Sequence, residues 1–248
     1  MDASVRLGKI RGIEIGIHYT WIFAFALITW SLAAGFFPIL YPGWSTGTYW
    51  LVGAVASALL FVSVLVHEMA HSLVAVSRGI PVESITLFIF GGVSGLRAEA
   101  RDPRDELLIA GVGPASSLLL AGFFFLLFVA LRGAPEQVTA LLGYLALING
   151  LLGVFNLLPG FPLDGGRLLR GAVWQVTGDL VQATNVAAGA GQLLAFLLIV
   201  WGLFQFFQAN FLGGIWSIAR RRSRGESRWR CKRPCVVCRW RRCSVATW

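Results

Sequence analysis

The stretch Ala54–Val76 reads AVASALLFVSVLVHEMAHSLVAV, an apolar run that carries three ionisable side chains in its second half. The run is longer than the roughly 20 residues that a helix needs to cross a bilayer. Residues four apart lie about 40° apart around a helix, so His67 and His71 face the same way and Glu68 lies beside them. Because ionisable groups are costly in an apolar helix, these three need a partner. The stretch therefore predicts a membrane-spanning helix that contains a polar site.

These polar residues have the H-E-x-x-H spacing of zinc hydrolases. Two imidazoles on one helix face can share one ion, and an adjacent glutamate can exchange a proton with water. Two of the three histidines of the chain lie here. We expect His67 and His71 to bind one zinc ion per chain, in a catalytic or a structural site, with Glu68 able to reach a metal-bound water. We interpret His18 as an interfacial residue.

The composition is that of a polytopic membrane protein. Hydrophobic residues make up 56% of the chain and charged residues 13%, and the mean hydropathy is +0.71. A soluble domain of this length could not bury so much apolar surface. We predict an all-α polytopic membrane protein, a bundle of five to six transmembrane helices. The predicted spans are 17–40, 49–76, 107–131, 138–158 and 186–207, followed by a short stub at 211–219.

The segment 82–96, between the second and third spans, has a strand pattern. Side chains alternate from Ile85 to Ile89, and the pair Gly91 and Gly92 indicates a turn or bulge. We predict a small membrane-associated β-hairpin here. Its edge could accept an unwound substrate as an added strand, with Ile89, Gly91 and Gly92 in contact with that substrate. Equally, the hairpin could be a structural plug of the bundle.

A second polar motif follows the fourth span, in the segment 156–166 that reads NLLPGFPLDGG. Prolines and glycines at this density end the helix and predict a tight loop. At membrane depth, such irregular backbone must be enclosed by protein or line a water-filled cavity. Catalytic zinc sites usually have three protein ligands, and Asp164 is the best candidate for the third. The alternative is that Asp164 only caps a helix that starts near Arg167.

The distribution of basic residues predicts the orientation of the bundle. They gather before the first span, after the second and after the fourth, whereas the loops after the first and third spans hold only Arg132. Basic residues favour the cytoplasmic side. We therefore expect a plasma-membrane protein whose N-terminus and active-site end, with His67 and His71, face the cytoplasm.

The segment before the third span carries a group of charged residues: Asp102, Arg104, Asp105 and Glu106. Asp102–Pro103 is a helix-start signal. We interpret the group as solvated and assign no function to it.

The two motifs together resemble those of the site-2 protease family of intramembrane zinc metalloproteases. The resemblance rests on HEMAH at 67–71 and NLLPGFPLDGG at 156–166, with GVGP at 111–114 as a weaker match. It extends from about Gly12 to Gly214, which is most of the chain.

This resemblance implies a zinc-dependent intramembrane endopeptidase that hydrolyses peptide bonds in or near transmembrane segments, as in regulated intramembrane proteolysis. His67, His71 and Asp164 would hold the zinc ion. Glu68 would be the catalytic acid/base, and Asn156 would help to hold the substrate or its oxyanion. The expected partners are transmembrane protein or peptide substrates and the lipid bilayer, with no nucleic acid. The sequence does not indicate an oligomeric state.

Two other functions fit the same motifs. A membrane metallopeptidase of the gluzincin type would use a glutamate as its third ligand; Glu83 and Glu99 are available, but neither has the helical context of such enzymes. A non-enzymatic zinc-binding or transport protein would use the same ligands without turnover. Substitution of Glu68 distinguishes the enzyme from the binding protein.

The C-terminal segment differs in composition from the rest of the chain. Residues 1–218 carry 10 basic and 11 acidic residues, whereas residues 219–248 carry 11 and 1 together with all four cysteines. We expect 1–218 to be the metalloprotease domain, with a truncated sixth helix, and 219–248 to be a disordered tail or an out-of-frame extension. A Leu- and Ala-rich helix encoded by a G+C-rich gene yields Cys, Trp and Arg when it is read in a shifted frame.

Overall fold

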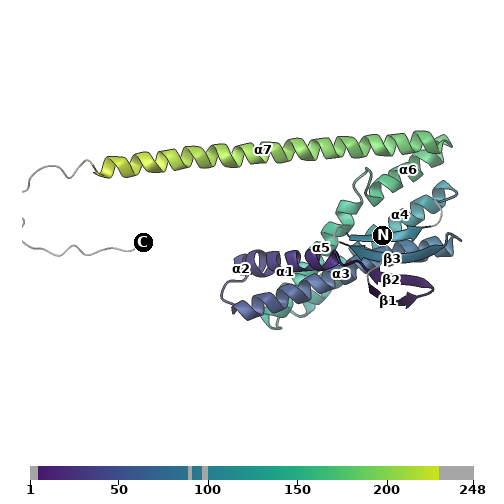
Figure 1. The fold of residues 1–248 in the computed structure, drawn as a ribbon, viewed down its shortest axis with the longest axis horizontal. Helices are drawn as coiled ribbons and strands as arrows, with labels where there is room; N and C mark the ends of the chain where they lie inside the picture. Colours follow the sequence, from purple (N-terminus) through teal and green to yellow (C-terminus); the bar gives the residue numbers. More distant parts are fainter. Residues whose placement is uncertain (1–4, 89–90, 97–99, 229–248) are drawn as a thin grey trace, which may run out of the picture. The chain divides into compact units, whose positions relative to one another are not determined.

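The computed structural model describes residues 5–88, 91–96 and 100–228. Residues 1–194 form one compact unit and residues 195–248 a second, and each is described by itself. The first unit is mostly helical, with a small sheet (Figure 1). The helices of the described chain are α1 (Trp21–Ser31), the π-helix η1 (Leu32–Phe36), α2 (Phe37–Leu40), α3 (Thr46–Ser77), α4 (Pro103–Ala130), α5 (Glu136–Asn156), α6 (Asp164–Thr177) and α7 (Leu180–Arg228), the last of which begins in the first unit and continues into the second.

Among the described residues, five helical segments are long and apolar enough to cross a membrane. They are Trp21–Leu40, Thr46–Ser77, Pro103–Ala130, Glu136–Asn156 and Leu180–Phe207. Each overlaps a predicted span, so the prediction of a polytopic helical membrane protein is confirmed.

The stub predicted at 211–219 is not a separate element. These residues continue α7, which is one helix of 49 residues. No proline interrupts this part of the chain, so nothing in its sequence forces the helix to end. Helix α7 continues past residue 218, where we predicted a domain boundary. The boundary itself stays a prediction. Residues 229–248 of the predicted tail lie outside the described residues.

The sheet has four strands in the order β1 (Val5–Ile10), β2 (Ile13–Ile17), β3 (Val82–Phe88) and β4 (Gly91–Leu96). Strands β3 and β4 pair antiparallel, which confirms the predicted hairpin. Strand β2 pairs parallel to β3, with Ile15 opposite Ile85. The hairpin is therefore half of a larger mixed sheet, and β4 is one of its two edges.

The N-terminal hairpin β1–β2 is an element that the sequence prediction missed. Its signal was available, because Ile13, Ile15 and Ile17 alternate with smaller or charged residues. The two residues between the strands, Arg11 and Gly12, have φ of 49° and 86°. Two positive φ values in succession are what a two-residue hairpin turn of type I′ requires.

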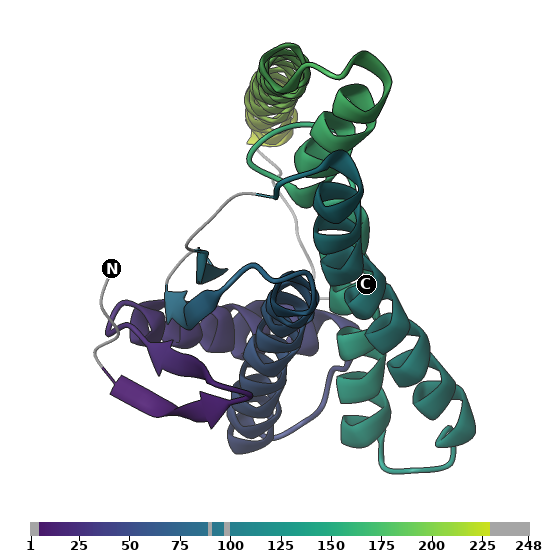
Figure 2. The same cartoon turned by 90° about the vertical axis from the view of Figure 1, so that its right-hand side faces the viewer.

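Helix α3 lies at the centre of the first unit. It contacts α1, α4, α5 and the β3–β4 hairpin, and Figure 2 shows the sheet and α1 on one side of α3 and α4 and α5 on the other. One buried cluster packs the sheet against the end of α3: Ile13, Ala75, Ile80, Val82, Ile85 and Ile109. A second lies toward its start: Leu32, Phe37, Val52, Ala56, Ala140, Tyr144 and Leu145. The two clusters fix α3 on either side of its histidines.

The loop 157–163, which joins α5 to α6, packs against α7 through glycines. A Cβ atom on Gly191 would overlap the carbonyl oxygen of Phe161, and one on Gly160 would lie 2.5 Å from the Cα atom of Gly191. Backbones can approach this closely only where no side chain intervenes. These glycines therefore fix the path of the chain into α6, which begins at Asp164.

Replacing Gly191 by alanine should destabilise the first unit. The added methyl group meets the Phe161 carbonyl, and overpacking of this kind costs about 1–3 kcal/mol. Gly189 in the same helix has open space around it, so Gly189→Ala is the matched control and should be neutral or slightly stabilising. Thermal unfolding in detergent measures both effects. Equal midpoints for the two variants would contradict the close approach.

Candidate metal centre

Three predicted ligands converge between α3 and the start of α6. The Nε2 atoms of His67 and His71 lie 3.2 Å apart. The Oδ2 atom of Asp164 lies 3.0 Å from Nε2 of His67 and 3.2 Å from Nε2 of His71. Both histidines are buried, and Asp164 is partly buried. Two segments far apart in the sequence thus bring three potential ligand atoms into one triangle.

The second nitrogen of each imidazole contacts α4. Nδ1 of His67 lies 2.9 Å from the hydroxyl oxygen of Ser117, and Nδ1 of His71 lies 2.6 Å from the carbonyl oxygen of Ile109. A carbonyl oxygen only accepts, so Nδ1 of His71 donates and its Nε2 presents a lone pair to the triangle. Bonds of this kind orient metal-binding histidines and fix their tautomer.

The triangle fits a zinc ion. Zinc is bound by nitrogen and oxygen at about 2.0–2.2 Å in a tetrahedral arrangement, which separates neighbouring ligand atoms by roughly 3.3 Å. The observed separations of 3.0–3.2 Å are close to this value. Nitrogen and carboxylate lone pairs that face one another at such distances need a positive charge between them. His67, His71 and Asp164 are therefore suited to hold one ion.

Asp164 is the first residue of α6 rather than its N-cap. The N-cap is Leu163, and the carboxylate of Asp164 contacts the histidines, so the capping alternative is wrong. Burial by itself raises the pKa of Asp164, but the neighbouring imidazoles of His67 and His71 outweigh burial and hold the pKa well below its ordinary value. The carboxylate is therefore ionised at neutral pH, as a metal ligand must be.

Helix α4 approaches the histidines at Gly113. A Cβ atom on Gly113 would overlap the imidazole rings of both His71 and His67. A Cβ atom on Gly111, by contrast, would make only an ordinary van der Waals contact, 3.6 Å from the side chain of Leu168. The motif GVGP at 111–114 therefore contributes more than helix packing, because one of its glycines lies at the candidate metal centre.

Glu68 lies against strand β4. A Cβ atom on Gly92 would lie 2.5 Å from Cγ of Glu68. The Glu68 carboxylate is also close enough to His67, His71 and Asp164 to interact with them electrostatically. The structure thus brings the predicted acid/base, the candidate ligands and an edge strand of the sheet to the same place.

Three other predicted site residues are not placed in this cluster. Gly91 begins β4 opposite Phe88, and Ile89 lies outside the described residues. Asn156 ends α5, where its side-chain amide donates to the carbonyl oxygen of Leu152 in the same helix.

Within the part of the chain that the structure describes, no glutamate joins His67, His71 and Asp164 as the gluzincin alternative requires. Glu83 is exposed on β3, and Glu99 lies outside that part. His18 contacts the hydroxyl of Thr20, and its backbone N–H donates to the carbonyl of Leu87. The third histidine therefore has a local structural setting away from the candidate ligands.

The interpretation of residues 102–106 as solvated is wrong for Glu106. This residue is fully buried and accepts hydrogen bonds from Arg167 and Arg170. The helix start is confirmed, since the carboxylate of Asp102 accepts from two backbone N–H groups in the first turn of α4. Helix α6 covers this face of α4, which no local sequence pattern indicates.

Ser117 and the carbonyl of Ile109 are two site groups that the sequence prediction missed. Ser117 is fully buried, and a hydroxyl in an apolar span is a signal that could have been followed. The Ile109 contact is made by the backbone, so it leaves no trace in the residue type.

Comparison with known proteins places this arrangement in a family. The family model of Peptidase family M50 matches residues 55–137 and 133–200. The chain belongs to peptidase family M50. A solved site-2 protease from Methanocaldococcus jannaschii matches this M50 chain with a TM-score of 0.54 and 32% identity, over 82% of this chain and 86% of that one. The resemblance to the site-2 protease family is thereby confirmed.

Curated relatives of this M50 chain are considerably longer. Rip3 from Mycobacterium tuberculosis is 43% identical over 218 residues, which is 87% of this chain and 55% of Rip3. Zinc metalloprotease MJ0392 from Methanocaldococcus jannaschii is 37% identical over 210 residues, 82% of this chain and 55% of that protein. The chain thus spans about half the length of the curated relatives it matches.

Replacing Gly113 by alanine should displace the imidazoles and weaken zinc binding by at least about tenfold, as disturbed metal-site contacts do. Gly111→Ala is the matched control in the same helix and should retain zinc, because its methyl group meets only an ordinary contact. Zinc content after dialysis, measured by atomic absorption, tests both variants. A full complement of zinc in Gly113→Ala would refute this placement of α4.

Proposed function

We propose that this chain is a zinc-dependent intramembrane endopeptidase that hydrolyses peptide bonds in or near the transmembrane segments of membrane proteins. The observation that carries the proposal is the triangle of His67, His71 and Asp164, with Glu68 beside it. Membership of peptidase family M50 supports zinc and proteolysis. The five apolar helices support a substrate that lies in or at the membrane.

The residues of the site divide into ligands and a proton carrier. His67, His71 and Asp164 would hold the zinc ion. When bound, zinc acts as a Lewis acid that polarises a peptide carbonyl and activates water for attack. The carboxylate of Glu68 takes a proton from the attacking water and returns it to the leaving amine. The contacts of α4 with both imidazoles keep the ligands oriented during this exchange.

Two substitutions should separate catalysis from metal binding. Glu68→Gln should lower cleavage by at least about 100-fold, because the proton carrier is lost, yet retain zinc. Asp164→Ala should lose both zinc and activity. Zinc content and cleavage are measured on the purified full chain, with a panel of single-span membrane proteins and signal-peptide remnants as substrates.

Glu83→Gln is the control for these variants, and it should behave like the wild type. Loss of zinc in Glu83→Gln would instead favour the gluzincin arrangement. Proteolysis that persists in Glu68→Gln would overturn the mechanism. A wild type that binds zinc but cleaves nothing in the panel would favour a binding or transport protein.

We also infer that the substrate binds as an added strand along β4. A transmembrane helix hides its carbonyl groups in hydrogen bonds, so its backbone must unwind before water can attack. An edge strand offers unpaired backbone groups to such a segment. Support comes from the contact of Gly92 with Glu68, which brings β4 next to the acid/base. Ile89 and Gly91 would take part in this binding, and Asn156 would help to hold the substrate.

Replacing Ile89 by proline should raise KM for cleavage several-fold, because proline removes a backbone donor two residues before β4 in the sequence, while zinc content stays unchanged. Val5→Pro, at the start of the opposite edge strand β1, is the control and should leave KM unchanged. Unchanged cleavage in a folded Ile89→Pro variant would count against strand addition and favour the structural plug.

We propose a multi-pass protein of the plasma membrane whose N-terminus and active-site end face the cytoplasm. The argument is the excess of basic residues in the segments at that end of the bundle. Arg167 and Arg170 contribute less to it than their number suggests, because both bind the buried carboxylate of Glu106. The argument therefore depends mainly on Arg6, Lys9 and Arg11 and on the basic residues of 78–104. Arg6, Lys9 and Arg78 also form ion pairs, but their side chains are more exposed than those of Arg167 and Arg170.

A further inference from the structure

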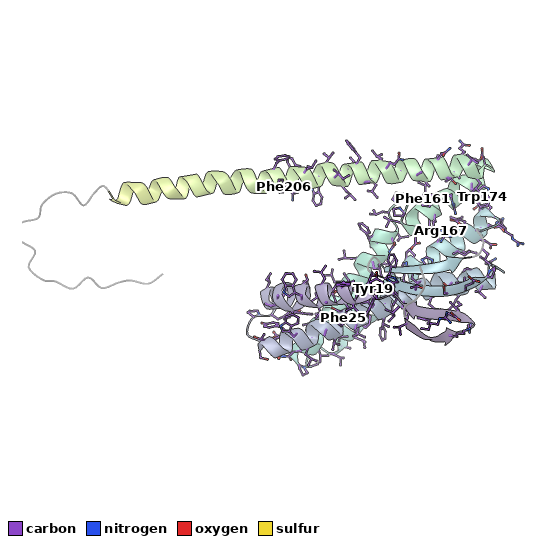
Figure 3. The ribbon with its side chains drawn as sticks, viewed as in Figure 1. Tyr19, Phe25, Phe161, Arg167, Trp174 and Phe206 are labelled. Atoms are coloured by element: carbon purple, nitrogen blue, oxygen red, sulfur yellow. The ribbon has the colours of Figure 1, made fainter. Side chains whose placement is uncertain are left out.

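A buried ion cluster joins α6 to the first turn of α4. The Oε1 atom of Glu106 accepts hydrogen bonds from Nε of Arg167 at 3.1 Å and from Nη2 of Arg170 at 2.7 Å. Its Oε2 atom accepts a longer bond from Nη2 of Arg167 at 3.4 Å. The guanidinium of Arg170 also lies over the ring of Phe161, 5.6 Å from its centre. Figure 3 labels Arg167 on α6 and Phe161 in the preceding loop.

Stability alone does not account for this cluster. Two cations and one anion lose hydration when they are buried, and apolar residues that pack equally well often give the same or greater stability. What an ion cluster adds is a defined geometry between the elements that carry it, because charge-assisted hydrogen bonds are directional. Here the elements are α4, which carries Glu106, and α6, which carries Arg167 and Arg170.

Each of these helices also provides a group that contacts the histidines of the candidate metal centre. On each helix this group lies one turn away from the residue that belongs to the ion cluster. On α4, the carbonyl of Ile109 that accepts from His71 lies three residues after Glu106. On α6, Asp164 lies three residues before Arg167. Residues three apart are neighbours on a helix surface. A displacement of α6 along α4 would therefore move the Asp164 carboxylate away from the imidazoles.

Helices α4 and α6 pack closely beside the ion cluster. A Cβ atom on Gly171 of α6 would lie 3.0 Å from Cγ of Leu107 and 3.3 Å from Cγ of Glu106. Close backbone approach brings the two arginines within reach of the buried carboxylate. The cluster and the close approach thus act on the same pair of helices.

We propose that Glu106 is a positioning residue for the metal centre. By binding Arg167 and Arg170, it sets where Asp164 stands relative to the two histidines. This inference rests on the proposed role of these three residues as zinc ligands. Glu106 is not itself one of the candidate ligands.

Cobalt binding by the full chain in detergent tests this role, because the visible absorption of Co²⁺ reports the ligands and geometry of its site. Glu106→Gln keeps the shape of the side chain but removes the charge, and it should weaken Co²⁺ binding about tenfold and alter the spectrum. Asp105→Asn is the matched control in the same helical turn. It removes a carboxylate that pairs with Arg78 at 3.5 Å instead of with α6, and it should bind Co²⁺ like the wild type.

Thermal unfolding of the metal-free protein distinguishes positioning from a purely structural role. A structural role predicts a lower midpoint for Glu106→Gln with unchanged Co²⁺ affinity in the folded protein, and that result would overturn the proposal. An equal loss of affinity in Asp105→Asn would also overturn it.

A second variant decides the matter if Glu106→Gln does not fold. Arg167→Lys keeps the positive charge but loses the planar two-point bond to the carboxylate. Weaker Co²⁺ binding in Arg167→Lys would support the positioning role, and wild-type affinity would refute it. A wild type that binds no Co²⁺ would refute the zinc site and this inference together. A wild type and a Glu106→Gln variant that bind it equally would refute only the inference.

Discussion

Helix α4 passes the two histidines of α3 so closely that no side chain fits between them. Gly113 permits this close approach because it has no side chain. The same helix binds the Nδ1 atom of each imidazole, through the hydroxyl of Ser117 and the carbonyl of Ile109. Polar groups that are buried away from water are stabilised by partners within the protein. The imidazoles are satisfied on one side by α4, which leaves their Nε2 atoms to face Asp164.

The third side of the site depends on a different constraint, the path of the chain between α5 and α6. Glycines let the loop 157–163 lie directly against backbone of α7, and the chain then enters α6 with Asp164 as its first residue. The ion cluster of Glu106 fixes α6 against the helix that already orients both histidines. The candidate metal ligands from two distant segments are thus connected through α4.

The sheet contacts Glu68, beside the candidate metal centre, from the opposite side of α3. Strand β4 reaches Glu68 because Gly92 has no side chain, and β4 is held in place by β3, which in turn pairs with the N-terminal hairpin. The proposed proton carrier Glu68 thus lies beside an edge strand, which suits the proposed addition of an unwound substrate segment to β4. The hairpin β1–β2 therefore supports the site indirectly, through its pairing with β3.

The sequence by itself determined the spans and the β3–β4 hairpin, and its two motifs predicted that His67, His71 and Asp164 meet. Spans follow from the length of apolar runs, and the ligand pair follows from helical periodicity, which are both local properties. Only the tertiary structure decided the burial of Glu106, the roles of Ser117, Ile109 and Gly113, and the parallel pairing of β2 with β3. These features depend on which helix covers which face and on backbone groups that every residue shares, so no pattern of side chains along the chain records them.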